Sequence, residues 1–236
     1  MTIEFGLLIL GSYLLGSVPP AYLAAKWSRG IDIRKHGTGK VGAANILSTA
    51  PKWLAIPVTI FDIGKGVLAV WIAQLLGFGA VEQIAVGSIT VIGHNWPIFL
   101  RFQGGRGIFT SLGVITMLSP KLGLIILAMP YAIAARPYAG QKRLEVALGV
   151  FLALVSLPIF SWFLSKPLDI EERMPITLGF VALSLIGLSK RLVARRTALS
   201  KSVSKWQLFV NRLLFDRDIK DRKAWINPTP SEQRNS

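Results

Sequence analysis

The sequence contains no cysteine and only two histidines among its 236 residues. Without thiols the chain has no disulfide framework, no thiolate nucleophile and no thiolate metal site, and two histidines cannot build a histidine-rich one. Charged residues are also few, at 17%, whereas hydrophobic residues make up 52% and the mean hydropathy is +0.50. This composition is too apolar for an ordinary soluble domain, and it indicates an integral membrane protein without a metal site.

Acidic residues are scarce as well: 12 Asp and Glu stand against 27 Lys and Arg, which gives a formal net charge of +15. Such a charge can indicate a nucleic-acid partner. Here, however, the basic residues lie in loops and a tail beside long apolar stretches, where the positive-inside rule accounts for them. We therefore expect contact with membrane lipid and no nucleic acid.

The alternation of apolar stretches and polar connections predicts an all-α integral membrane protein with about seven transmembrane helices. Glu4 precedes the first stretch in place of a basic segment, so we expect no cleaved signal peptide. The connection over residues 26–52 carries six basic residues and one acid, which predicts a cytoplasmic loop and an N-terminus outside. The predicted spans are residues 5–25, 53–76, 81–100, two within 107–135, 144–164 and 174–192.

Residues 107–135 decide the topology of the second half. One straight helix over this range would be about 43 Å long, which exceeds a hydrocarbon core of about 30 Å. Pro120 also interrupts the range midway. We therefore expect two short crossings sheltered by their neighbours, with Arg136, Lys142, Arg143 and the C-terminus on the cytoplasmic side. A single crossing would reverse these assignments.

The composition changes after the last predicted span. We divide the chain into a transmembrane domain, residues 1–192, and a basic cytoplasmic tail, residues 193–236. In the tail, apolar residues such as Trp206, Phe209 and Leu213 are interleaved with basic ones, which predicts an amphipathic helix on the anionic inner leaflet. The final residues are rich in Pro, Asn and Ser, and we expect them to be disordered.

Residues 93–107 (GHNWPIFLRFQGGRG) form a polar, glycine-rich passage between apolar segments. Glycines on both sides of Arg106 offer exposed backbone N–H groups beside a fixed cation, which suits a phosphate. The predicted phosphate-binding residues here are Gly104, Gly105 and Arg106, with His94 as a candidate for proton transfer. The alternative is a tight interfacial turn in which His94 only packs or caps.

A second glycine-rich loop lies in the first cytoplasmic connection. Its residues 37–42 match the letters of a dinucleotide fingerprint, but no strand precedes them, and a Walker A loop fails because Val41 replaces the hydroxyl residue after Lys40. What remains is a loop whose amides and cations suit an anion. The predicted phosphate-binding residues of this loop are Arg34, Gly37, Gly39 and Lys40.

Asp62 and Lys65 lie three residues apart inside the second predicted span. That spacing puts both side chains on one face of a helix. Charges at such a depth are costly and usually face a partner or a cavity. The pair therefore either locks helices together or supports the substrate, and the sequence leaves both roles open.

Four segments together carry a resemblance to a known family. They are residues 16–19 (GSVP), 30–45 (GIDIRKHGTGKVGAAN), 62–66 (DIGKG) and 93–107. In order and spacing they resemble the bacterial acyl-phosphate:glycerol-3-phosphate acyltransferases (PlsY). The resemblance implies a multi-pass enzyme of the cytoplasmic (inner) membrane, active on the cytoplasmic side, that moves an acyl chain from acyl phosphate to the 1-hydroxyl of glycerol 3-phosphate. The product, lysophosphatidic acid, enters phospholipid biosynthesis. No cofactor is implied, and the sequence does not indicate an oligomeric state.

The candidate residues suit this chemistry. An acyl phosphate is a mixed anhydride with a good leaving group, so attack by a hydroxyl needs mainly positioning, charge neutralisation and oxyanion support. His94 is the candidate to accept or relay the hydroxyl proton, although the leaving phosphate can take it instead. Thr38 and Asn45 are candidates to hold the hydroxyl or the acyl carbonyl. A His-x4-Asp pair, which marks a different acyltransferase class, is absent because Ile98 stands four residues after His94.

The sequence also departs from the family pattern. Thr38 stands where the family usually has Ser, and Lys40 where it has Asn. The family's third motif is represented only by Arg136-Pro137-Tyr138, without its following serines. These changes keep two alternatives open: a transporter of an organic phosphate, and a membrane protein that binds lipid without catalysis.

Overall fold

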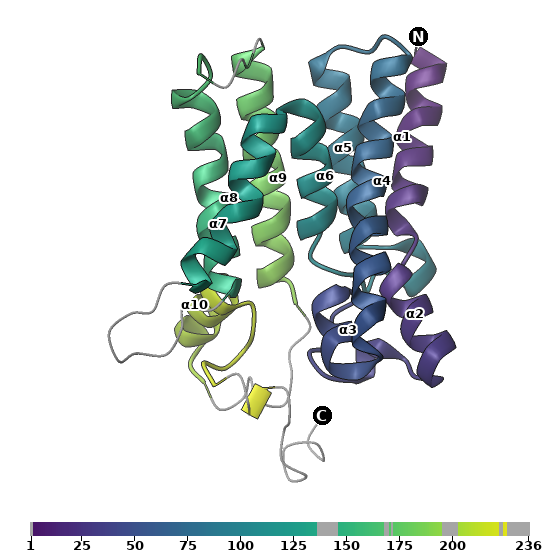
Figure 1. Ribbon diagram of the computed structural model, residues 1–236, viewed down its shortest axis with the longest axis vertical. Helices are drawn as coiled ribbons and strands as arrows, with labels where there is room; N and C mark the ends of the chain where they lie inside the picture. The colour runs from purple at the N-terminus through teal and green to yellow at the C-terminus, as the bar shows by residue number, and fades with distance from the viewer. Residues whose placement is uncertain are drawn as a thin grey trace.

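The computed structural model describes residues 2–135, 146–167, 170, 172–194, 203–221 and 224–225 (Figure 1). Within these ranges the chain forms helices, short 3-10 turns and loops, and no strand, so the all-helical prediction is confirmed. The long helices are α1 (Thr2–Ser17), α4 (Ala55–Leu75), α5 (Ala80–Asn95), α6 (Ile108–Leu118), α7 (Pro120–Ala135), α8 (Val146–Phe163) and α9 (Arg173–Leu192).

These helices form an elongated bundle. α1 packs against α5, α4 packs against α6, and α9 packs against both α5 and α8. In Figure 1, α6 lies between a group formed by α1, α4 and α5 and a group formed by α7, α8 and α9. The arrangement brings the ends of α4, α5, α6 and α9 together at the end of the bundle opposite the N-terminus, where the short helices also lie (Figure 1).

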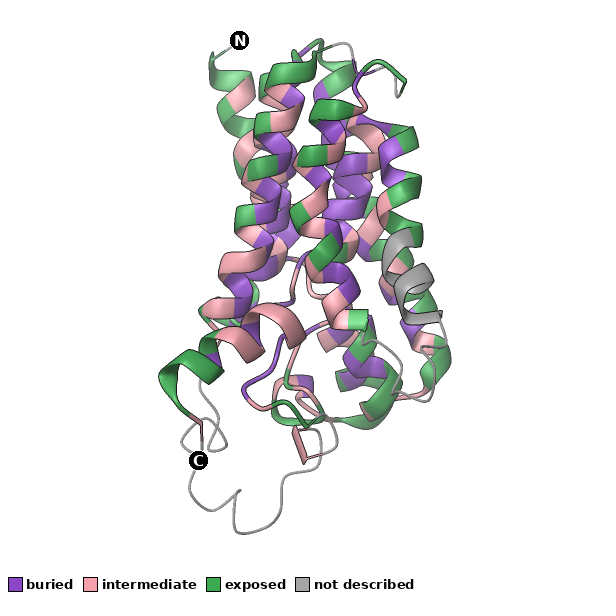
Figure 2. Ribbon diagram, turned by 90° about the vertical axis from the view of Figure 1, so that its left-hand side faces the viewer, coloured by how far each residue is buried: buried purple, intermediate pink, exposed green. Residues whose placement is uncertain are grey.

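The outward surface of the bundle is apolar. Ile56, Ile60 and Leu75 of α4 are all exposed, and Figure 2 shows exposed residues on the outer faces of helices whose inner faces are buried. Four helical stretches of the described chain are long and apolar enough to cross a membrane: Thr2–Arg29, Lys52–Leu75, Val146–Phe163 and Arg173–Leu192. α6 is apolar but shorter. This surface suits lipid as the solvent.

The first predicted span is wrong as a single helix. The structure ends α1 at Ser17 and begins α2 (Pro20–Arg29) after a break at Val18 and Pro19. Proline disfavours the helical conformation of the residue before it and lacks the N–H that would continue the ladder, so two prolines in succession end α1. The third predicted span is also too long, because α5 ends at Asn95, two residues before Pro97.

The predicted break within residues 107–135 is confirmed. α6 ends at Leu118 and α7 begins at Pro120, where proline is tolerated as the first helical residue. α6 and α7 pack against each other. A Cβ atom on Gly123 would lie 2.5 Å from Oγ1 of Thr116, so a glycine is needed where the two helices approach closely.

Glycines also set the tight packing that positions the end of α5. A Cβ atom on Gly16 of α1 would lie 2.2 Å from the carbonyl oxygen of Thr90, and one on Gly93 would lie 2.4 Å from the carbonyl oxygen of Tyr13. The backbones of α1 and α5 are therefore in near contact. This contact fixes the last turn of α5, which carries His94.

Three short helices surround the end of the bundle opposite the N-terminus: α2, α3 (Ala43–Thr49) and α10 (Lys205–Phe215) (Figure 1). α10 begins with a capping box in which the Ser204 hydroxyl accepts from the backbone N–H of Gln207. The predicted helix in the tail is thus confirmed, whereas its position on a lipid leaflet stays a prediction. The third-motif residues Arg136-Pro137-Tyr138, the basic residues Lys142 and Arg143, and the final residues 226–236 lie outside the described residues.

Candidate active site

The side chain of Asn45 holds the backbone of the first glycine-rich loop by hydrogen bonds. Its side-chain Nδ2 donates to the carbonyl oxygens of Ile33, His36 and Lys40 at 3.0–3.1 Å, and its Oδ1 accepts from the backbone N–H of Thr38 at 2.9 Å. Asn45 is only 1% exposed. Its polar atoms are therefore occupied by the loop, although Asn45 also lies in the wall of the second cavity described below.

The glycines of this loop serve its backbone geometry. Gly37 and Gly39 have positive φ angles of 58° and 68°, a region that residues with a Cβ atom rarely adopt. A Cβ atom on Gly37 would also lie 2.3 Å from Oδ1 of Asn45. The tight turn aims Thr38 and Lys40 into the cavities described below.

The second glycine-rich loop folds back against the last turn of α5. The N–H of Gly105 donates to the carbonyl oxygen of His94 at 3.1 Å, so the prediction that this N–H is exposed is wrong. A Cβ atom on Gly105 would lie 2.1 Å from Nε2 of His94, and one on Gly104 would lie 2.2 Å from the His94 carbonyl oxygen. These glycines allow close approach to the histidine, and Arg106 between them and Gly107 carries the charge that this part of the loop brings to both cavities.

His94 lies in a buried cluster with Asp62 and Lys65 of α4. Nζ of Lys65 lies 2.9 Å from Oδ1 of Asp62 and 2.8 Å from Nδ1 of His94, while Nδ1 of His94 lies 3.3 Å from Oδ1 of Asp62. Asp62 and Lys65 are each 2% exposed. The same ammonium donates to the carbonyl oxygens of Gly16 and Val18 at the end of α1. The pair thus ties α4 to the end of α1 and also contacts His94, whereas a role in supporting the substrate stays a prediction.

The distances indicate which nitrogen of His94 carries the proton. A charged Lys65 is only a donor, so its 2.8 Å contact makes Nδ1 the acceptor and leaves the proton on Nε2. The opposite tautomer would need a hydrogen bond from Nδ1 to Asp62, whose distance is longer at 3.3 Å. The geometry therefore favours an Nε2–H group beside Gly105, available as a donor to an oxygen of substrate.

Removing the Asp62 carboxylate is expected to destabilise the bundle. In Asp62→Ala the Lys65 ammonium would stay buried without its charged partner, and breaking such a pair typically costs about 3–5 kcal/mol. We expect a clear fall in the thermal unfolding temperature in detergent. The double variant Asp62→Ala/Lys65→Met, which removes both charges, is expected to recover part of the loss. An unfolding temperature equal to wild type in the single variant would contradict this account.

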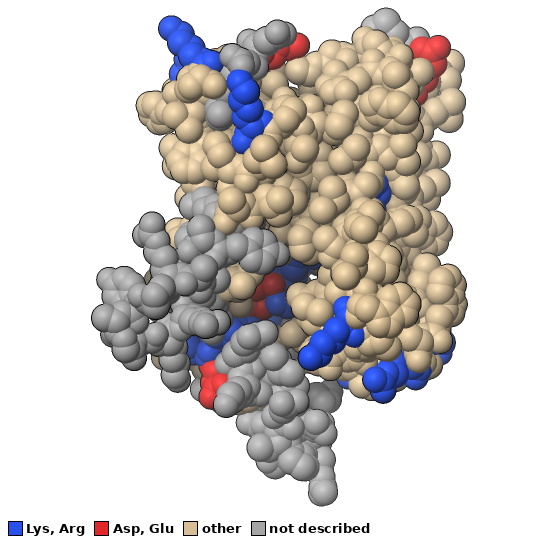
Figure 3. Space-filling model, in the orientation of Figure 1, with Lys and Arg blue, Asp and Glu red and all other residues tan. Residues whose placement is uncertain are grey.

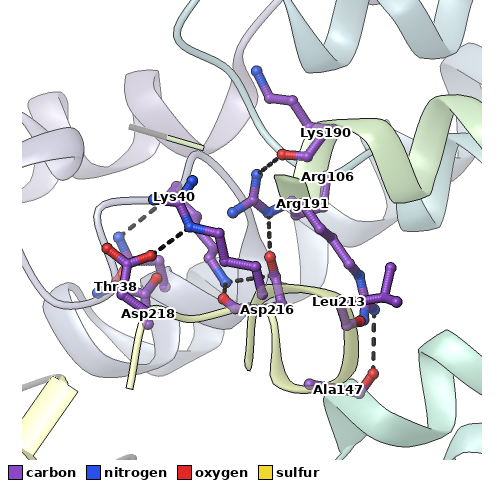
Figure 4. A network of polar contacts seen from close by, with 11 residues as sticks. Thr38, Lys40, Arg106, Ala147, Lys190, Arg191, Leu213, Asp216 and Asp218 are labelled. Carbon is purple, nitrogen blue, oxygen red and sulfur yellow. Dashed lines mark hydrogen bonds and ion pairs between the residues drawn. The ribbon is translucent and has the colours of Figure 1, made fainter. Parts of the chain in front are cut away.

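A cluster of cations from three separate segments meets one carboxylate (Figure 4). Nε of Arg106 lies 2.8 Å from Oδ1 of Asp216, and Nζ of Lys40 contacts Oδ2 and the backbone oxygen of the same residue. Arg106 also donates to the carbonyl oxygen of Lys190 at 2.6 Å. Arg191 lies beside them and donates to the carbonyl oxygen of Leu213 at 2.7 Å.

Burial and neighbouring charges shift the titration of this cluster. Burial lowers the pKa of Lys40 to about 8, with Arg106 and Arg191 acting in the same direction and Asp216 opposing them. Burial would raise the pKa of Asp216, but Arg106, Lys40 and Arg191 outweigh it and hold this pKa at about 2. Asp216 is therefore ionised at neutral pH, and Lys40 is mostly charged there.

Two cavities of about 510 Å³ each adjoin this cluster. Both are lined by Thr38, Lys40, Arg106, Arg191 and Asp216. The first also has Arg34, Gly39, Gly104 and Lys190 in its wall, and the second has Asp62, His94 and the apolar residues Ile108, Phe109, Val150 and Phe215. In Figure 3 a hollow at this end of the molecule exposes basic and acidic atoms in its interior.

The structure thus brings most of the predicted site residues together. Arg34 lies further out: it pairs with Asp32 at 2.7 Å, donates to the carbonyl oxygen of Leu100, and lines only the first of the two shared cavities. Within the described residues, no group of His, Asp and Glu has the arrangement of a metal site. The combination of cations, a buried histidine and an apolar wall is suited to a substrate with both a phosphate and an acyl chain.

Sequence reasoning missed Lys190, Arg191 and Asp216 as site residues. Lys190 and Arg191 have one signal in the sequence: they lie at the end of the last apolar stretch, in the last turn of α9. Cations there also interact favourably with the helix dipole, so the signal is not specific for a site. Asp216 had none, since it is one of several acids in a basic tail. Its approach to Lys40 joins positions 176 residues apart in the sequence.

Comparison with known proteins identifies the family. Residues 6–197 match the family model described as Glycerol-3-phosphate acyltransferase. The chain belongs to that family. Glycerol-3-phosphate acyltransferase 4 of Dehalococcoides mccartyi strain CBDB1 is 43% identical over 227 residues, which cover 96% of this chain and 95% of that protein. Glycerol-3-phosphate acyltransferase 5 of the same species, strain ATCC BAA-2266, is 42% identical over 99% of this chain and 98% of its own length.

The fold of this acyltransferase family member is also similar to solved structures. A crystal structure of PlsY, an integral membrane glycerol 3-phosphate acyltransferase in its glycerol 3-phosphate form, superposes with a TM-score of 0.68 at 25% identity. The match covers 85% of this chain and 100% of that one. The resemblance inferred from the motifs is therefore confirmed. The family model ends before α10 and Asp216, so the cation cluster combines residues inside and outside the matched range.

Proposed function

We propose that this protein transfers an acyl chain from acyl phosphate to the 1-hydroxyl of glycerol 3-phosphate and so produces lysophosphatidic acid. The observation that carries the proposal is one cavity whose lining combines the cations Lys40, Arg106 and Arg191 with His94 and with apolar residues. Family membership supports the acyl transfer itself. The basic side chains would hold phosphate groups by charge-assisted hydrogen bonds, and the apolar residues Phe109, Val150 and Phe215 would contact the acyl chain.

The chemical step requires little from the protein beyond positioning. The glycerol oxygen forms a bond to the acyl carbon, the bond from that carbon to the phosphate oxygen breaks, and inorganic phosphate leaves. With Nδ1 accepting from Lys65, the Nε2–H of His94 would donate to the oxygen that gains negative charge. The departing phosphate then takes the hydroxyl proton, because this tautomer of His94 has no free nitrogen to accept it.

The remaining predicted site residues take supporting roles in this proposal. Thr38 lines both cavities and would contact substrate oxygens, whereas Asn45 would hold the loop that presents Thr38 and Lys40. Gly37 and Gly39 would give that loop its turn, and Gly104 and Gly105 would allow close contact with His94. Asp62 and Lys65 would position the histidine rather than contact substrate.

We further propose that the bundle crosses the cytoplasmic membrane seven times, with the N-terminus outside and the site at the cytoplasmic surface. The basic residues gathered around the site support this orientation through the positive-inside rule. α10 would lie at the leaflet surface, because it exposes aromatic side chains that suit the membrane interface. The rings of Trp206 and Phe209 stack with their centroids 5.6 Å apart, and the two residues are 71% and 41% exposed. The tail would therefore form part of the membrane-facing edge of the enzyme.

Acyl transfer by the purified full-length protein tests the function. Glycerol 3-phosphate is offered with palmitoyl phosphate or, separately, with palmitoyl-CoA, in lipid nanodiscs. We expect lysophosphatidic acid only from palmitoyl phosphate, because the cations of the cavity suit a phosphate bonded directly to the acyl carbon, which the thioester lacks. Product from palmitoyl-CoA alone would overturn the assignment of the donor. No product from either donor in folded protein would overturn the acyl-transfer proposal, and uptake of glycerol 3-phosphate into liposomes would then favour a transporter.

A further inference from the structure

The tail carboxylate of Asp216 occupies the position best suited to a phosphate. Arg106 and Lys40, from the two glycine-rich loops, both contact it, and Arg191 lies beside them (Figure 4). Asp216 is 8% exposed and follows α10, in a part of the chain beyond the family match. We propose that Asp216 is a specificity-determining residue: it is an internal counter-anion that fills the phosphate subsite, and a substrate phosphate binds by displacing it. This inference rests on the proposed function for the nature of the substrates.

Charge explains why displacement is needed. The carboxylate is ionised at neutral pH, since its pKa lies at about 2. A phosphate monoester carries a charge of about −1.5 to −2 at neutral pH. Two anions cannot share the same cation pair without strong repulsion, because the site is partly withdrawn from water. The phosphate must therefore take the contacts that Lys40 and Arg106 now make with Asp216.

The backbone around Asp216 is held independently of its carboxylate. Arg191 donates to the carbonyl oxygen of Leu213 at 2.7 Å, and Arg212 donates to the carbonyl oxygen of Leu192 at 2.9 Å and pairs with Asp218 at 2.7 Å. These contacts fasten α10 to the end of α9. The side chain of Asp216 can therefore rotate away from the cations while the tail stays in position.

The backbone conformation of Asp216 fits this role. The residue caps α10 with a φ angle of 55°, in the left-handed region that Asp adopts more readily than most residues. Its carboxylate contacts Lys40 and Arg106, and the residue lines both cavities. A group that must leave before substrate binds reduces the apparent affinity of the site by the fraction of molecules in the open state. The tail thus sets how tightly the enzyme holds its phosphate ligands.

The test compares Asp216→Asn with Asp218→Asn. The first change keeps the shape and removes the charge on the cation pair; the second removes a charge from the same tail that pairs with Arg212 instead. We expect Asp216→Asn to lower the KM for at least one phosphate substrate about 5- to 10-fold, with kcat changed less. Asp218 also lines the first cavity, so Asp218→Asn measures the loss of a tail carboxylate that pairs with Arg212, and its effect on either KM should be much smaller than that of Asp216→Asn. In an Arg106→Ala background, the gain from Asp216→Asn should be largely lost.

Separate measurements identify the displacing phosphate. A fall in KM for glycerol 3-phosphate alone assigns the subsite to the soluble substrate, and a fall for palmitoyl phosphate alone assigns it to the donor. Either outcome supports displacement. A rise or no change in both KM values would overturn it, as would an equal effect of Asp218→Asn, which would indicate that loosening the tail is the cause.

Calorimetric binding of inorganic phosphate separates this inference from the proposed reaction. Tighter binding to Asp216→Asn than to wild type would support the counter-anion even if the protein transferred no acyl chain. Equal or weaker binding would overturn the counter-anion, while acyl transfer by the wild type would still stand.

Discussion

His94→Ala is expected to lower kcat about 10²–10³-fold, the usual effect of removing one preorganised donor to a developing oxyanion. The bundle should stay folded, because Asp62 and Lys65 remain paired with each other at 2.9 Å after the imidazole is removed. The measurement is kcat at saturating concentrations of both substrates, together with the thermal unfolding temperature. His36→Ala is the matched control, because it removes the other histidine, which is exposed and belongs to the first loop.

The His94→Gln variant distinguishes a hydrogen-bond donor from a base. A glutamine amide donates a hydrogen bond but does not accept a proton at neutral pH. If His94 acts through its Nε2–H, Gln should retain part of the activity that Ala loses. Equal loss in the Gln and Ala variants would favour His94 as the proton acceptor. An equally large loss in His36→Ala would remove the assignment of His94 altogether.

Arg106→Ala is expected to raise the KM for a phosphate-bearing substrate about 10- to 100-fold, with a smaller change in kcat. A hydrogen bond to a charged group contributes about 1.5–3 kcal/mol, and Arg106 is the cation that the second glycine loop directs into both cavities. Steady-state kinetics with each substrate varied in turn measures the effect. Arg106→Lys should retain part of the affinity for phosphate, because it keeps the positive charge but loses the bidentate hydrogen bonding of the guanidinium.

Arg101→Ala is the matched control for this prediction. Arg101 is an exposed arginine in the same segment and lines neither of the two cavities that adjoin Asp216. Its removal lowers the net charge by the same amount. If both arginine variants raised KM equally, the effect would come from general electrostatic attraction and not from a phosphate contact at Arg106.

The apolar pattern predicted most helices because lipid requires long uninterrupted stretches and leaves few alternatives. Pro120 correctly predicts the break between α6 and α7. Pro19 and Pro20 lie inside one predicted span, but in the structure they follow the end of α1. The difference lies in length. Residues 107–135 are too long for one crossing, so a break was required, but residues 5–25 are the right length for an unbroken helix.

The site was predictable only where chemistry is local. The motifs selected Lys40, His94 and Arg106, which the structure brings to the same cavity, because a loop glycine beside a polar group is visible in a few residues of sequence. The hydrogen bonds of Asn45 are not visible in the sequence, since they depend on carbonyl groups that the folded loop brings to one point. The contact of Asp216 with Lys40 and Arg106 depends on the packing of α10, which no pattern within the tail encodes.

The break after α1 has a consequence for how the protein is made. The carbonyl oxygen of Gly16 has no helical N–H to accept from, because the residue four positions later is Pro20. Lys65 of α4 supplies that missing donor in the folded protein. During synthesis, α1 emerges from the ribosome before α4, and an unsatisfied carbonyl in lipid costs several kcal/mol in general. We therefore expect α1 to wait at the insertion machinery until α4 arrives, so that the two helices enter the lipid as one unit.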